Sequence, residues 1–67
     1  MAEFSEVERE IVAWLLDELP VPGIAQKMGR SDREIEQRIR VLYSKLGIAN
    51  RKELRAVPSH LIYGQAD

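Results

Sequence analysis

Several polar residues between positions 33 and 44 have side chains that can recognise the edges of nucleic-acid bases. At about 100° per residue along a helix, they share one face, with Glu36 and Val41 on its flanks: Arg33, Gln37, Arg40 and Ser44. Arginine can donate two hydrogen bonds to guanine O6 and N7, and glutamine can pair in the same way with adenine N6 and N7. A glutamate such as Glu36 can accept from cytosine N4, although it repels phosphates. The same stripe also fits a solvent-facing helix without a ligand, so both interpretations stay open.

The opposite face of the same segment is apolar. Taking Ile35 as the reference direction, the other large apolar residues lie within about 40° of it: Ile39, Leu42 and Leu46. This spacing predicts an amphipathic helix over residues 32–46 with its apolar side in a core.

Charge is distributed unevenly along the chain, although the formal net charge is only -1. Residues 1–20 carry six acidic side chains and one basic side chain. Residues 27–55 carry nine basic and four acidic side chains, a local excess of five positive charges. Such asymmetry suits an anionic partner on one side of the molecule, but a solvated face of mixed charge explains it equally well.

The elements that would position these residues begin at well-marked caps. Ser5 with Glu8, Ser31 with Glu34, and Asn50 with Glu53 each have the spacing of a capping box. Pro20 and Pro58 are helix breakers, and Gly29 and Gly47 are typical of the residue that follows a helix. These signals predict helices at about 6–18, 22–28, 32–46 and 51–57, followed by a tail over 58–67.

No strand pattern occurs in the 67-residue sequence, which predicts one all-α domain. A short helix, a glycine turn and a longer helix predict a helix-turn-helix unit within a four-helix domain. The acids of the first helix are interpreted as a solvated face with favourable placement near the helix dipole. The predicted core consists of Val7, Ile11, Trp14, Leu15, Ile24, Ala25, Met28, Ile35, Ile39, Leu42, Leu46 and Leu54, with Val12 a further candidate.

The composition argues against several classes of function. The chain has no cysteine and one histidine, His60, so we expect no metal site and no cofactor. The serines have no histidine base in reach, so we expect no enzyme activity. The longest apolar run, at 11–16, is too short to cross a membrane, and we expect a cytoplasmic protein.

Several short segments together resemble the LuxR/GerE-type helix-turn-helix family. Phe4 and Ser5 followed by Glu-Arg-Glu at 8–10, the pair at 24–25, and Ser31 match its pattern. The strongest match is Tyr-Ser-Lys-Leu-Gly-Ile at 43–48, followed by Arg51 and Leu54. The match runs without gaps from 4 to about 57. It implies a four-helix fold with the third helix in the major groove of DNA, as in the stand-alone members similar to GerE.

The chain departs from that pattern at several positions. Glu34, Ile35 and Glu36 replace a common Thr-Val-Lys run, and Arg38 takes the place of a histidine. Residues 20–23 read Pro-Val-Pro-Gly where the family has a polar segment, and Arg30 replaces an apolar residue. A lysine facing the groove has therefore become a glutamate.

Two functions follow as expectations. The first is a sequence-specific transcriptional regulator that binds double-stranded DNA, with Arg33, Glu36, Gln37 and Arg40 as base-reading candidates. The phosphate-binding candidates are Lys27, Arg30, Arg38, Tyr43, Lys45, Arg51 and Lys52; Tyr43 lies about 80° from the core direction and can instead pack at its edge. The second is a protein-interaction module, an adaptor or anti-activator that binds another regulator. A homodimer through the fourth helix and the tail at Leu61–Tyr63 is compatible with both.

Overall fold

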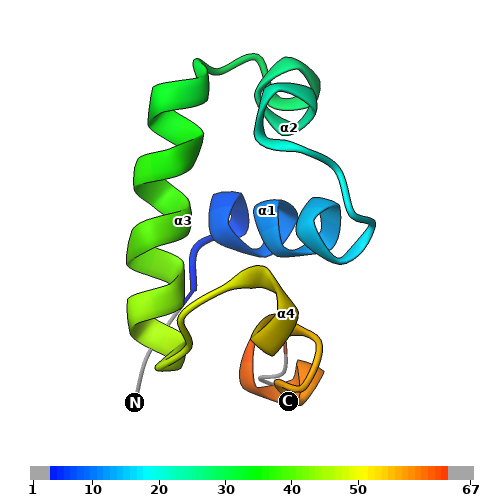
Figure 1. The fold of residues 1–67 in the computed structure, drawn as a ribbon, viewed down its shortest axis with the longest axis vertical. Helices are drawn as coiled ribbons and strands as arrows, with labels where there is room; N and C mark the ends of the chain where they lie inside the picture. Colours follow the sequence, from blue (N-terminus) through cyan, green and yellow to red (C-terminus); the bar gives the residue numbers. More distant parts are fainter. Residues whose placement is uncertain (1–3, 64–67) are drawn as a thin grey trace.

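The computed structural model describes residues 4–63, and helices are the only regular elements in that range (Figure 1). Four α-helices are followed by one short 3₁₀ helix, in the order α1 (Glu6–Leu16), α2 (Val21–Met28), α3 (Asp32–Leu46), α4 (Arg51–Leu54) and η1 (Ser59–Leu61). Across this range no helix has the length and apolar character needed to cross a membrane.

The predicted caps form at the start of α1, α3 and α4, but only the first is a complete capping box. The Ser5 hydroxyl accepts from the Glu8 N–H at 3.1 Å, and Glu8 Oε1 accepts from the Ser5 N–H at 2.9 Å. Ser31 and Asn50 likewise accept from the third residue of their helices, at 3.1 and 3.0 Å. Their glutamates do not complete the box, because Glu34 binds two arginines and Glu53 accepts from the N–H of Ala49.

Two helices end earlier than predicted. α1 stops at Leu16 instead of residue 18, because the chain turns at Glu18, whose φ of 65° lies in the left-handed region. α4 stops at Leu54 instead of residue 57. Pro58 disfavours helical backbone at the residue before it, so the chain leaves α4 through tight turns. Within the described part of the predicted tail, η1 forms and Ile62 is buried; residues 64–67 lie outside the described residues.

The glycines predicted to follow helices do so in the left-handed conformation. Gly29 closes α2 with φ 66°, and Gly47 closes α3 with φ 70°. The N–H groups of Arg30 and Ile48 then bond back to carbonyls five residues earlier, at 2.9 and 3.0 Å. This left-handed backbone lets each helix end sharply, and a side chain at either glycine would strain it.

The longest helix, α3, is the element around which the first two helices pack. In Figure 1, α1 runs across one side of α3, α2 connects to the upper end of α3 through a short turn, and α4 with η1 lies below α1. α3 packs against both α1 and α2, and α4 packs against α1. One side of α3 is therefore covered along much of its length, and its other side carries the exposed residues described below.

The core differs from the predicted set at its edges. Ten apolar side chains are buried: Phe4, Ile11, Val12, Leu15, Ile24, Ala25, Ile35, Leu42, Leu54 and Ile62. The predicted core residues at 7, 14, 28, 39 and 46 are only half-buried and pack around this centre. Phe4 and Ile62 were not predicted, because each lies outside the periodic helical segments and is buried by the way the chain ends fold back.

Candidate functional site

The exposed side of α3 presents the base-reading candidates together. Arg33, Gln37, Arg40 and Glu36 are all exposed, as is Ser44 one turn beyond Arg40. Within residues 4–63 none of these side chains makes a hydrogen bond or an ion pair. Their donors and acceptors are therefore directed to solvent along a helix of 15 residues, which leaves them available to a partner.

Arg30 and Arg38, two of the phosphate candidates, both bind Glu34. Arg30 pairs with its carboxylate, and Arg38 Nε lies 3.3 Å from the same oxygen. The hydrogen bond from Arg30 lowers the pKa of Glu34, against a smaller opposing effect of burial and with help from Arg38. This cluster neutralises part of the positive charge beside the exposed face.

Lys45, another phosphate candidate, forms an ion pair with Glu8. Its Nζ lies 2.9 Å from Glu8 Oε1 and 5.4 Å from the ring centroid of Phe4. Glu8 is buried, so the prediction that the acids of α1 form a solvated face is wrong for this residue. Burial opposes ionisation of Glu8, but the Ser5 N–H and the Lys45 ammonium outweigh it, and the pKa of Glu8 is lowered. Glu8 and Lys45 thus join the start of α1 to the end of α3.

Tyr43 and Arg51, two further phosphate candidates, lie near each other. Arg51 Nη1 donates to the carbonyl oxygen of Leu19 at 2.7 Å, and its guanidinium lies close enough to Tyr43 to influence the pKa of the phenol. Burial raises the pKa of the half-buried Tyr43 hydroxyl, with Arg51 acting in the opposite direction. Tyr43 packs at the edge of the core, which was one of the two alternatives left open for it.

The remaining basic residues divide between paired and unpaired. Lys27 lies over Trp14, 5.6 Å from the ring centroid, and Arg55 pairs with Glu18. Trp14 packs half-buried against the core, and its Nε1 lies 3.4 Å from Glu10. In the part of the chain that the structure describes, three of the nine basic side chains of residues 27–55 have no partner: Arg33, Arg40 and Lys52.

Val41 also belongs to the exposed face, although its position on the flank of the predicted stripe kept it out of the candidate set. It is 51% exposed. Two shallow hollows of about 480 and 440 Å³ flank it, and both include Gln37 and Val41 in their lining. The signal in the sequence was a valine among polar residues at helical spacing from Gln37.

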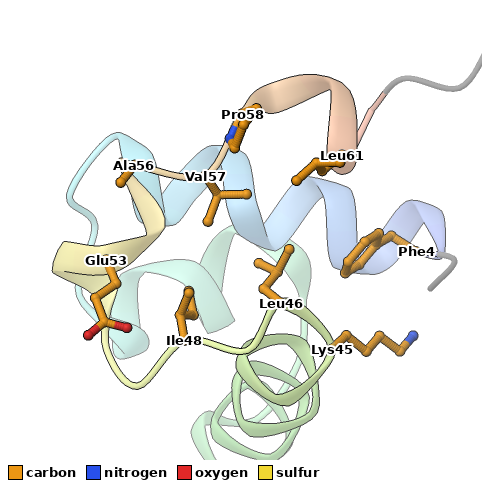
Figure 2. A pocket seen from close by; sticks show the side chains of 9 residues that line it. All are labelled: Phe4, Lys45, Leu46, Ile48, Glu53, Ala56, Val57, Pro58 and Leu61. Atoms are coloured by element: carbon orange, nitrogen blue, oxygen red, sulfur yellow. The ribbon is translucent and has the colours of Figure 1, made fainter. Parts of the chain in front are cut away.

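A separate apolar groove of about 500 Å³ lies where the end of α3 meets α4 and η1. Figure 2 shows apolar side chains along it, with Lys45 at one end and Glu53 at the other. Its lining consists of Phe4, Lys45, Leu46, Ile48, Glu53, Ala56, Val57, Pro58 and Leu61. Leu61 is 53% exposed, so part of this groove presents apolar surface to solvent. Sequence periodicity did not reveal the groove, because four separate segments build it.

Within residues 4–63 there is no group of three or more histidine, cysteine or acidic side chains able to hold a metal ion. Comparisons of the chain with models of known families, with curated proteins and with solved structures find no match.

Proposed function

We propose that this chain is a sequence-specific DNA-binding regulator of transcription, a cytoplasmic binding protein and not an enzyme, and that α2, the Gly29 turn and α3 act as a helix-turn-helix. The observation that carries the proposal is the exposed face of α3, where Arg33, Gln37 and Arg40 have no internal partner. Hydrogen-bonding side chains held on one face of a rigid helix suit the major groove, whose width admits an α-helix.

Each residue of that face has a specific role in this proposal. Arg33 and Arg40 donate to guanine O6 and N7 or to nearby phosphates, and Gln37 pairs with adenine N6 and N7. Glu36 accepts from cytosine N4, which excludes other bases at that position because an unpaired carboxylate near phosphates is unfavourable. Glu36 therefore contributes selectivity at a cost in affinity.

Phosphate binding in this proposal involves fewer residues than the sequence suggested. Lys52 has no internal partner, and the side chains of Arg38 and Lys45 remain 38% and 33% exposed beside their carboxylate partners. Arg51 is engaged with the carbonyl oxygen of Leu19, and Tyr43 packs against the core beside it. Because each phosphate contact adds to both the nonspecific affinity and its salt dependence, we expect weak nonspecific binding with a shallow dependence on salt.

A second candidate function is a protein-interaction module that binds another regulator. Two observations favour it: the carboxylate of Glu36 on the exposed face of α3, and the apolar groove beside α4 and η1. Under this alternative Glu36 faces a basic partner, and the domain retains negligible affinity for DNA.

The groove also supports weak self-association in the DNA-binding proposal. A second copy related by a two-fold axis would place Lys45 at one end of the groove near Glu53 of its partner, with apolar side chains between them. Sedimentation velocity over a range of concentrations tests this: Leu61→Glu is expected to abolish a concentration-dependent dimer. Leu16→Glu, which makes the same change at a less exposed leucine of α1, is expected to preserve it. A dimer that tolerates Leu61→Glu contradicts the groove as its interface.

Fluorescence polarisation with random-sequence duplex DNA at low salt tests the function itself. Arg40→Ala is expected to weaken binding and to relax preference at one base position by about 1–3 kcal/mol. Arg55→Ala is the matched control, since Arg55 lies outside α3 and is paired with Glu18. Equal losses in both variants, or no binding by the unmodified chain, would count against a DNA-reading role for α3.

A further inference from the structure

Val41 is the one large apolar side chain of α3 that is neither buried nor half-buried. Ile35 and Leu42 are buried, Ile39 and Leu46 pack half-buried against the core, and Val41 is 51% exposed. A β-branched residue in the middle of a helix has lower helix propensity than many polar residues. Neither helix formation nor core packing therefore accounts for valine at this position.

The surroundings of Val41 set it apart from the isolated apolar residues common on protein surfaces. Together with Gln37, Arg40, Ser44 and Lys45 it lines a hollow of about 440 Å³. It also helps to line the neighbouring hollow beside Glu8. Gln37 lies four residues earlier, so the two side chains are neighbours along the helix surface. A pair of methyl groups thus lies next to an amide at the border between two hollows.

An A·T base pair presents complementary chemistry in the major groove. Adenine offers N6 and N7 to an amide, and thymine offers a C5-methyl group to an apolar side chain. We infer that Val41 contacts the C5-methyl of a thymine, and that with Gln37 it makes the α3 face select for A·T pairs at or beside the position that Gln37 reads. This inference rests on the proposed DNA-binding function and adds to it a specificity-determining residue and a base.

The experiment removes first the C5-methyl of thymine and then the two γ-methyl groups of Val41. Preferred duplexes are first selected from a random-sequence pool with the full chain, and each thymine of the selected site is then replaced by deoxyuridine, which lacks only the C5-methyl. Loss of one buried methyl predicts about a three- to fivefold weaker affinity at the contacted thymine. In Val41→Ala the same replacement is expected to have no effect. Leu16→Ala, which removes an exposed apolar side chain of α1, should behave as the unmodified chain.

The outcomes separate this inference from the function on which it rests. Failure to bind or select any duplex removes both. Selection of a site in which every deoxyuridine replacement is silent, or of a site made only of G·C pairs, overturns the role of Val41 and leaves DNA binding standing. If Val41→Ala keeps the full sensitivity to deoxyuridine, the role of Val41 is likewise overturned and DNA binding stands.

Discussion

Two Glu–Arg pairs with the same spacing on α3 behave differently. Glu34 and Arg38 form an ion pair with 3.3 Å between their nearest atoms, whereas Glu36 and Arg40, also four residues apart, form none. Glu34 and Arg38 are partly shielded and share Arg30 as a third member, whereas both residues of the second pair are exposed. Exposed ion pairs contribute little, because water screens the attraction and the side chains lose entropy.

The charged side chains of a helix therefore have to be divided into those that already bind a partner within the domain and those that do not. The positive residues of 27–55 look alike in the sequence, yet most of them already have partners within the domain, at Glu34, Glu8, Glu18 and Leu19. Arg33 and Arg40 do not. The shielded side of α3 thus stabilises the domain, and the exposed side is free to bind.

The largest expected contrast is between adjacent residues on the two sides of α3. Leu42→Ala removes a fully buried side chain and should lower the free energy of unfolding by about 2–5 kcal/mol. Val41→Ala should change it by less than about 0.5 kcal/mol, because the side chain is exposed. Urea denaturation followed by circular dichroism measures both. Equal destabilisation would mean that Val41 is part of the core.

A smaller effect is expected where Glu8 joins α1 to α3. Glu8→Ala removes half of the Ser5 capping box and the partner of Lys45, and should lower the free energy of unfolding by about 1–3 kcal/mol. The control is Glu36→Ala, which removes the same charge from the exposed face and should be nearly neutral. The same denaturation measurement applies, and similar values for the two variants would refute the distinction between shielded and exposed sides.

The pH dependence of stability should show the same contrast. The pKa of Glu8 is lowered by folding, so its contribution is present above the ordinary value of 4.5 and is lost as the pH falls through the lowered pKa. Glu8→Gln should therefore narrow the difference in stability between neutral and acidic pH. Thermal melts of both proteins across this range test it, with Glu36→Gln expected to parallel the unmodified chain. Parallel curves for Glu8→Gln would exclude Glu8 as a contributor.

The smallest expected effect on folding is at Glu34, with a larger one on binding. Glu34→Gln removes the carboxylate that holds Arg30 and Arg38 and frees both to contact phosphates. Duplex affinity at low salt should rise and become more sensitive to salt, while the melting temperature changes little. Polarisation titrations over a salt series measure this. An unchanged salt dependence would show that the two arginines lie outside the interface.

Local signals predicted the helices well, and the parts that depend on three-dimensional contacts were missed. Gly29 and Gly47 fix the ends of α2 and α3 through backbone geometry that neighbours in sequence determine. Glu8 looked like any acid of an amphipathic helix, because its partner Lys45 is distant in sequence. The burial of Phe4 and Ile62 was missed for the same reason, because it depends on contacts between segments that are distant in sequence.

The candidate site also has parts that local sequence signals predicted and parts that depend on contacts between distant segments. Periodicity was sufficient to group Arg33, Gln37 and Arg40 on one exposed face. It could not show that Arg51 binds the carbonyl oxygen of Leu19 and lies near Tyr43, since these residues are distant in sequence or belong to different helices. The apolar groove was equally out of reach, because its walls come from four segments.

Charge reversal at Glu36 tests the central claim, that the exposed face of α3 binds duplex DNA, most directly. Glu36→Lys is compared with Asp17→Lys, which makes the same change in net charge at the end of α1 that points away from α3 in Figure 1. Titrations against random-sequence duplex over a salt series should show stronger binding for Glu36→Lys. The slope of log affinity against log salt should steepen by about 0.9, with little change for Asp17→Lys. Identical responses of the two variants, or weaker binding by Glu36→Lys, would contradict the account.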